Sequence, residues 1–215
     1  RGRDILLNFG AVDWQADVWV NGAKVGSHTG GYTPFSLNIT PALKTAGDNE
    51  LVVRVWDPTD LGPQPRGKQV AKPELIWYTP VSGIWQTVWL EPVNPTHISN
   101  LKITPDIDRN TLRVEVLSAG SGNGYMTEVT VKESGKTIAT GKALAGEPMV
   151  IGMPADVKLW SPDSPHLYDL EVRLTDKGKT LDKVDSYAAM RKISTKMGDK
   201  GMVRLQLNNK DLFHY

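Results

Sequence analysis

Alternation of apolar and polar residues recurs along this 215-residue chain and constrains its fold more than any other feature. It is clear in residues 51–56 (LVVRVW), 112–116 (LRVEV) and 170–175 (LEVRLT). Successive side chains of a β-strand point to opposite faces, so each run predicts a strand with one buried and one wetted face. The one helical signal is Thr40-Pro41, which predicts a single turn with Thr40 as its N-cap. We therefore expect an all-β chain built from antiparallel sandwiches.

Turn signals separate the predicted strands. Asn21-Gly22 lies between two apolar runs and predicts a type I′ hairpin, because both central residues of that turn need a positive φ. Three further pairs give weaker hairpin signals: Ser134-Gly135, Lys177-Gly178 and Asn208-Asn209. Short strands joined by such turns are typical of antiparallel sheets.

Composition excludes several classes of function. Lys plus Arg number 25 and Asp plus Glu 24, so the net charge of +1 does not suit a surface that binds nucleic acid. The absence of cysteine excludes disulfides, thiol catalysis and cysteine-ligated metals. No run reaches the roughly 18 apolar residues of a membrane span. We expect no cofactor, and the sequence leaves periplasmic, secreted and cytoplasmic locations open.

A change in composition predicts the domain boundaries. Six of the seven tryptophans lie at or before Trp89, and the proline-punctuated segment 92–95 follows. We predict domains at 1–93 and 94–192, then a polar linker at 192–200 and a strand hairpin within a final segment, 193–215. Because the chain begins directly in a strand pattern and ends on aromatic residues, we expect it to be a fragment of a longer protein.

Metal and catalytic motifs are weak. The four histidines are far apart in the sequence and show no metal-ligand spacing. Asp106, Asp108 and Asn110 resemble the start of a calcium loop, but Thr111 replaces the required glycine. We interpret this segment as a polar turn between two strands. We expect neither a metal site nor a catalytic residue in this chain.

The segment from Asp57 to Pro80 is the strongest candidate for a functional loop, because long loops without regular structure are often functional. Asp57 and Asp60 could imitate the carboxylate pair of a glycosidase, but Asp-Pro more often forms an Asx turn. Planar hydrogen-bonding groups beside aromatic rings suit a sugar, whereas a solvated connection is an equal alternative. The candidate carbohydrate-binding residues are Asp57, Arg66, Lys68, Gln69, Trp77 and Tyr78.

Several long motifs resemble family 2 of the glycoside hydrolases, which includes β-galactosidases, β-glucuronidases and β-mannosidases. Four motifs are similar to its N-terminal sugar-binding domain, a galactose-binding-like jelly roll: residues 12–22 (VDWQADVWVNG), 25–35 (VGSHTGGYTPF), 49–55 (NELVVRV) and 80–90 (PVSGIWQTVWL). Residues 160–168 (WSPDSPHLY) resemble its immunoglobulin-like sandwich. Residues 207–213 (LNNKDLF) resemble the strand that leads into its catalytic (β/α)₈ barrel.

The resemblance implies an accessory region of a retaining, β-galactosidase-like enzyme, whose two catalytic glutamates lie in a barrel outside this chain. That barrel and a carbohydrate are the implied partners. Gly30 stands where some β-galactosidases of the family carry an acidic residue. We expect Tyr32 and Phe35 to enter the core, and Trp85 and Trp89 to pack in the core or between domains. A free-standing carbohydrate-binding module and a structural sandwich protein remain alternatives.

Overall fold

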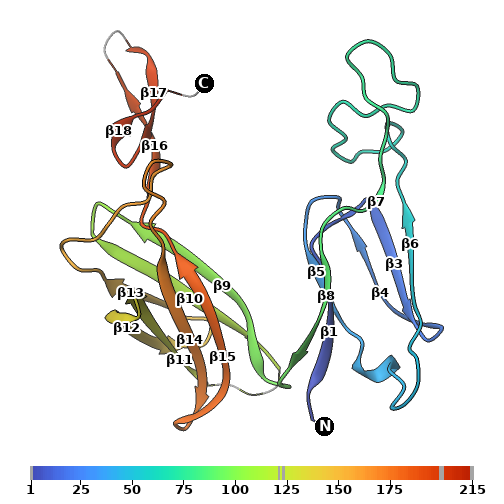
Figure 1. The fold of residues 1–215 in the computed structure, drawn as a ribbon, viewed down its shortest axis with the longest axis horizontal. Coiled ribbons are helices and arrows are strands. Elements are labelled where there is room, and N and C mark those ends of the chain that lie inside the picture. The colour runs from blue at the N-terminus through green and yellow to red at the C-terminus, as the bar shows by residue number, and fades with distance from the viewer. Residues whose placement is uncertain (1, 121, 123, 199–200, 214–215) are drawn as a thin grey trace. The chain divides into compact units, whose positions relative to one another are not determined.

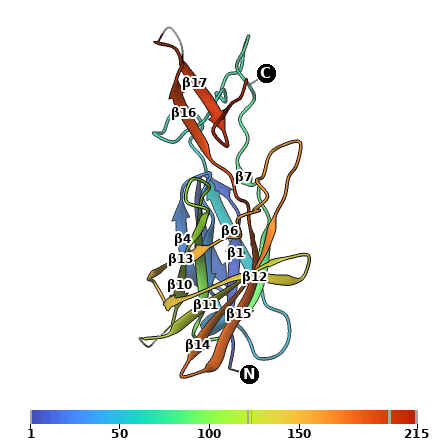
Figure 2. The ribbon, with the colours of Figure 1, turned by 90° about the vertical axis from the view of Figure 1, so that its left-hand side faces the viewer.

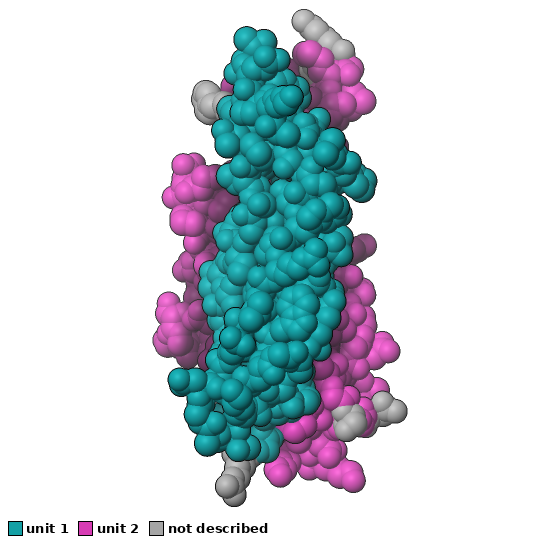
Figure 3. All heavy atoms as spheres, turned by 90° about the vertical axis from the view of Figure 1, so that its right-hand side faces the viewer, with its two compact units in different colours: residues 1–93 teal, residues 94–215 magenta. Residues whose placement is uncertain are grey.

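The computed structural model describes residues 2–120, 122, 124–198 and 201–213. Within these ranges the regular structure is almost entirely β-strand, as the alternation predicts, with a 3₁₀ turn at Thr40–Ala42 (Figure 1). No helix there is long or apolar enough to cross a bilayer. The chain divides into two compact units, Arg1–Val93 and Asn94–Tyr215, which are coloured separately in Figure 3.

Unit 1 is a sandwich of antiparallel sheets around one apolar core. One sheet has the order β5 (Phe35–Asn38), β1 (Asp4–Phe9), β8 (Val88–Val93), and the other has the order β4 (Ala23–Thr29), β3 (Gln15–Val20), β6 (Leu51–Trp56). A short pair, β2 (Val12–Asp13) and β7 (Gly83–Ile84), forms a separate two-stranded sheet. The fully buried core comprises Leu7, Phe9, Val12, Ala16, Val18, Val20 and Ile39. Phe35 packs against this core, as expected.

The predicted hairpin turns are confirmed. Asn21 and Gly22 have φ values of 51° and 80° between β3 and β4. The Asn21 side chain also donates to the Ala42 carbonyl at 2.7 Å and accepts from the Glu50 amide at 3.0 Å, so it joins three segments. Both central residues of the three weaker turn signals also have positive φ.

The predicted helical turn forms, but its cap differs from the expectation. The 3₁₀ helix η1 covers Thr40–Ala42, with Ile39 rather than Thr40 at the N-cap position. The Thr40 hydroxyl instead accepts a hydrogen bond of 2.7 Å from the Ile5 amide. Thr40 therefore ties the turn to β1, a long-range contact that a local sequence pattern does not reveal.

Unit 2 contains a second sandwich of two antiparallel sheets. One has the order β13 (Pro148–Gly152), β10 (Thr111–Ala119), β9 (His97–Asp106), and the other has the order β12 (Lys136–Leu144), β11 (Met126–Glu133), β14 (Tyr168–Asp176), β15 (Lys179–Ala188). Val114 and Val116 of β10 are buried in one core with Val129 of β11 and Leu170 of β14. The polar turn between β9 and β10 is also confirmed, because Asp106 accepts from the amide of Asp108 at 3.1 Å.

A third sheet of unit 2 corrects the linker prediction. Residues 193–197, expected in a polar linker, form β16 (Ile193–Met197), which pairs with β17 (Val203–Leu207) and through it with β18 (Lys210–Asp211). This sheet extends beyond one end of the sandwich of unit 2 (Figures 1 and 2). Asp108 contacts two residues beside this sheet. Its carboxylate forms an ion pair with Lys192, which precedes β16, and accepts a hydrogen bond of 2.8 Å from Asn209, in the turn between β17 and β18. Polar composition did not reveal β16, because its pairing comes from residues that lie later in the chain. Residues 199–200 of the predicted linker fall outside the described residues.

Three aromatic side chains that we expected in the core of unit 1 lie outside it. Tyr32, Trp85 and Trp89 are all exposed. Trp89 lies opposite Asn8 in the β1–β8 pair, on the face that points away from the core residue Leu7. Tyr32 and Trp85 meet at a pocket instead of entering the core.

A charge cluster on β14 predicts an acid-sensitive stability. Glu171 accepts hydrogen bonds from Lys132, Arg173 and Lys183, which lower its pKa to about 2. Because the folded pKa lies below the unfolded value, this carboxylate stabilises the fold above about pH 4.5, and the contribution is lost as the pH falls toward 2. We expect Glu171→Gln to flatten this part of the melting temperature–pH profile. The exposed turn variant Glu147→Gln should retain the wild-type profile, and an equal flattening in both variants would contradict the assignment.

Candidate functional site

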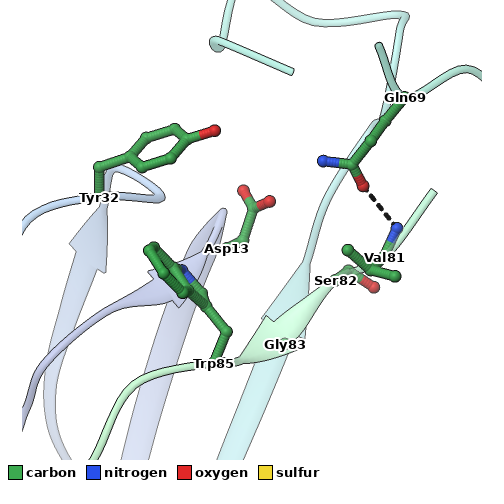
Figure 4. Close-up of a pocket in the computed structure, with 7 residues that line it drawn as sticks. All are labelled: Asp13, Tyr32, Gln69, Val81, Ser82, Gly83 and Trp85. Carbon is green, nitrogen blue, oxygen red and sulfur yellow. Dashed lines mark hydrogen bonds between the residues drawn. The ribbon is translucent and has the colours of Figure 1, made fainter. Parts of the chain in front are cut away.

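A pocket of about 260 Å³ lies in unit 1 where β2 and β7 meet the long loop between β6 and β7 (Figure 4). Its volume is slightly below the roughly 300–1,000 Å³ that is usual for small-molecule sites, a size that suits one ring rather than a long chain. Seven residues line it: Asp13, Tyr32, Gln69, Val81, Ser82, Gly83 and Trp85. They come from segments far apart in the sequence, which the sandwich brings together.

Two aromatic rings form one wall of the pocket. The Trp85 indole nitrogen donates to the Gly31 carbonyl at 2.7 Å, which fixes the orientation of the ring. Tyr32 meets Trp85 edge-on, with centroids 5.8 Å apart and an interplanar angle of 74°. Both rings remain exposed, so they present apolar surface to anything that enters the pocket.

Asp13 directs its carboxylate into the same pocket (Figure 4). Burial, and secondarily the charge of Asp57, raise the pKa of Asp13. Gly31 makes room for this carboxylate, because a Cβ at position 31 would lie 2.6 Å from Oδ1. Among the described residues only burial and the charge of Asp57 act on this carboxylate, and it lines the pocket, so its oxygens can accept hydrogen bonds from a ligand.

Gln69 lines the side of the pocket opposite the two aromatic rings. Its Oε1 accepts a hydrogen bond of 2.6 Å from the Val81 amide, which leaves its Nε2 directed toward the cavity (Figure 4). The backbone around it is held by a parallel bridge to Tyr78 and by the Tyr78 amide, which donates to the Lys68 carbonyl at 2.8 Å. The pocket therefore combines a fixed amide donor, a carboxylate acceptor and an aromatic wall.

The base of the loop is held by Asp57, and this confirms the predicted Asx turn. Its Oδ1 accepts from the Thr59 amide at 2.8 Å and from Nε2 of the buried Gln64 at 3.1 Å. Asp60 accepts from the Ala71 amide at 3.3 Å and pairs with Arg66 at 3.7 Å. Both carboxylates therefore hold loop segments together, and neither lines the aromatic pocket.

Two cation–aromatic contacts stiffen the outer part of the loop. The Arg66 guanidinium lies 5.6 Å from the centroid of the Trp77 ring, and the Lys68 ammonium lies 5.6 Å from that of Tyr78. Such contacts are worth about 0.5–1 kcal/mol each at exposed sites. They hold Trp77 and Tyr78 beside the two basic side chains.

The structure brings the six predicted residues together only in part. Gln69 lines the pocket, while Asp57 and Arg66 lie next to it in a tightly packed cluster that also includes Asp13 and Gln69. Lys68, Trp77 and Tyr78 do not line the pocket. The sequence reasoning missed Asp13, Tyr32 and Trp85; the one available signal was a polar Asp13 inside an otherwise apolar run. No three His, Cys, Asp or Glu side chains of the described ranges gather as a metal site.

Comparison with known proteins identifies the family. Residues 2–92 match the sugar binding domain of glycosyl hydrolases family 2, and residues 96–191 match a second domain of the same family. The chain belongs to glycosyl hydrolase family 2. It corresponds to N-terminal domains of that family, an arrangement that agrees with the all-β fold of both units.

Individual relatives support this assignment. A putative β-glucuronidase of Formosa agariphila is 32% identical over 88% of this chain and 18% of its own length. A β-galactosidase of Thermoanaerobacter pseudethanolicus is 29% identical over 90% of this chain and 26% of its own. The chain therefore spans about a fifth to a quarter of the length of these curated relatives.

Solved structures show the same fold. A family 2 member from Bacteroides cellulosilyticus matches with a TM-score of 0.73 and 26% identity, over 99% of this chain and 27% of that chain. A β-glucuronidase from Ruminococcus gnavus, solved with D-glucuronic acid, has a TM-score of 0.77 at 20% identity, over 99% of this chain and 37% of that chain. This second likeness concerns the fold alone.

The proximity of two carboxylates yields a prediction for Asp13. Replacing Asp57 with asparagine removes a like charge but retains the oxygen that accepts from Thr59 and Gln64. We expect Asp57→Asn to move the pKa of Asp13 partway down toward the ordinary aspartate range, because burial continues to raise it. Carboxyl ¹³C NMR titration measures this directly. The control Asp60→Asn should leave the pKa of Asp13 unchanged. Equal pKa shifts in both variants would contradict the electrostatic coupling between Asp13 and Asp57.

Proposed function

We propose that this chain is the non-catalytic, sugar-binding accessory region of a family 2 glycoside hydrolase. The family matches over residues 2–92 and 96–191 carry the proposal, because they correspond to a sugar binding domain and its neighbouring domain. The relatives are named as β-glucuronidases and β-galactosidases, which supports a parent enzyme that cleaves O-glycosidic bonds in carbohydrate metabolism.

For the parent enzyme we propose a β-galactosidase-like reaction with retention of configuration. Retaining enzymes use two carboxyl groups about 5–5.5 Å apart, one as acid/base and the other as nucleophile. Asp57 and Asp60 are poor candidates, because their oxygens already accept from loop amides. The proposal therefore assigns catalysis to glutamates of a barrel outside residues 1–215, with that barrel as the partner of the two units.

Sugar contact is proposed at the aromatic pocket and along the adjoining loop. An apolar face of a sugar ring suits the exposed face of Trp85, while its hydroxyls suit the Asp13 carboxylate and the Gln69 amide. The other loop residues proposed for carbohydrate contact are Asp57, Arg66, Lys68, Trp77 and Tyr78. Their cation–aromatic pairs hold planar groups at fixed positions beside the pocket.

A free-standing carbohydrate-binding module is the second candidate, because the pocket residues all belong to unit 1. A purely structural sandwich is the third. The two differ in one property: a module binds a free sugar in solution, whereas a structural sandwich does not.

Sugar binding is predicted to depend on Trp85. We expect the 215-residue chain to bind a methyl β-galactoside or β-glucuronide at millimolar concentration, as monitored by NMR shift changes at the pocket residues. Trp85→Ala should weaken binding about tenfold or more, because it removes the stacking surface. Trp56→Ala is the matched control, since Trp56 (51% exposed) is as accessible as Trp85 (52%) but lies on β6 outside the pocket. Equal loss in both variants would contradict the site.

Catalytic activity is predicted to be absent from the isolated chain. We expect no release of nitrophenol from nitrophenyl β-galactoside or β-glucuronide above the buffer blank. Hydrolysis by the purified chain that Asp57→Ala or Asp13→Ala abolishes would overturn the assignment of catalysis to another domain. For a longer protein that contains the barrel, ¹H NMR of the first-formed anomer tests retention.

A further inference from the structure

The side chains that line the aromatic pocket of unit 1 carry charge of one sign. Asp13, whose carboxylate points into the cavity (Figure 4), is the one acidic residue among them. Burial raises the pKa of Asp13, and so does the charge of Asp57, which is a second anion. No Lys, Arg or His of the described residues lines the cavity. A ligand group that enters the pocket therefore meets negative charge.

The two cations of the adjoining loop are held by other partners. Arg66 lies in the tightly packed cluster next to the pocket, where its guanidinium donates to the Gln69 carbonyl at 3.3 Å and pairs with Asp60 at 3.7 Å. The Lys68 ammonium lies 5.6 Å from the centroid of the Tyr78 ring. Neither side chain lines the pocket. Among the described residues, no cation is therefore placed to pair with an anionic group inside it.

The hydrogen-bonding character of Asp13 matters as much as its charge. An ionised carboxylate accepts hydrogen bonds and cannot donate them, so it matches a sugar hydroxyl but not a second carboxylate. The neutral amide of Gln69 can donate to either group, so it does not offset this difference. Because the cavity of about 260 Å³ suits a single ring, a carboxylate on that ring would lie within about one ring's width of Asp13.

We propose that the aromatic pocket of unit 1 selects uncharged sugar rings over uronic acids, and that Asp13 is the residue that determines this selectivity. The selectivity rests on the proposed sugar site and names the class of sugar which that site takes. The relatives do not decide between the two classes, since they are named as β-glucuronidases and as β-galactosidases. Repulsion between like charges in a partly buried site should weaken the binding of a uronate about fivefold or more.

Three methyl glycosides that share one ring test the proposal with the 215-residue chain: methyl β-galactoside, methyl β-galacturonide and the amide of the galacturonide. The galacturonide carries a carboxylate at C6, and its amide keeps the planar group without the charge. The titrations are run at about pH 8, well above the usual pKa of an aspartate. We expect NMR titration of the Trp85 indole resonance to give a dissociation constant about fivefold or more higher for the galacturonide than for the other two.

Asp13→Asn tests the role of the residue. It keeps the size of the side chain and removes its charge, so the dissociation constants of the galacturonide and its amide should come within about twofold of each other. Glu91→Gln is the matched control, because Glu91 is an exposed carboxylate of unit 1 that does not line the pocket. This variant should retain the wild-type ratio. Circular dichroism checks that both variants fold, and the wild-type ratio tests the selectivity without any substitution.

The outcomes separate the selectivity from the sugar site itself. Equal or tighter binding of the galacturonide than of its amide would overturn the selectivity and leave the sugar site standing. A preference that Asp13→Asn leaves intact, or that Glu91→Gln removes equally, would overturn the role of Asp13. If none of the three glycosides shifts the Trp85 resonance, the proposed sugar site fails and the selectivity fails with it.

Discussion

Burial of alternate side chains between facing antiparallel sheets is the constraint on which both units depend. In unit 1 this brings Leu7 and Phe9 of β1 into one core with Val18 of β3, and each fully buried side chain of this size contributes about 1.5–3 kcal/mol. The strand pairing in turn determines where the loop residues lie. β2 and β7 pair through Val12 and Ile84, which brings Asp13 and Trp85 to the same pocket.

The pocket is preorganised by hydrogen bonds to the backbone. Trp85 is fixed by the Gly31 carbonyl and Gln69 by the Val81 amide, so the ring and the amide keep their positions without a ligand. Preorganisation of this kind reduces the entropy that a ligand must remove on binding. In the accessory role that we propose, unit 1 presents these fixed groups to a sugar.

Much of the fold follows from the sequence, because its determinants are local. The strand alternation and the Asn21-Gly22 turn require only neighbouring residues, and both are confirmed. The strand β16 and the role of Thr40 were missed, since each depends on a partner far along the chain. The site was predicted less well for the same reason. Gln69 was identified from the composition of its loop, whereas Asp13 and Trp85 meet only through the pairing of β2 with β7.

The central claim is that the pocket of unit 1 binds a sugar. A structure determined from crystals of this chain soaked with a methyl β-galactoside or β-glucuronide tests it most directly. Our account predicts one sugar ring stacked on Trp85, with hydroxyls within hydrogen-bond distance of the Asp13 carboxylate and the Gln69 amide. Density for the sugar at a different surface, with the pocket left unchanged, would contradict it.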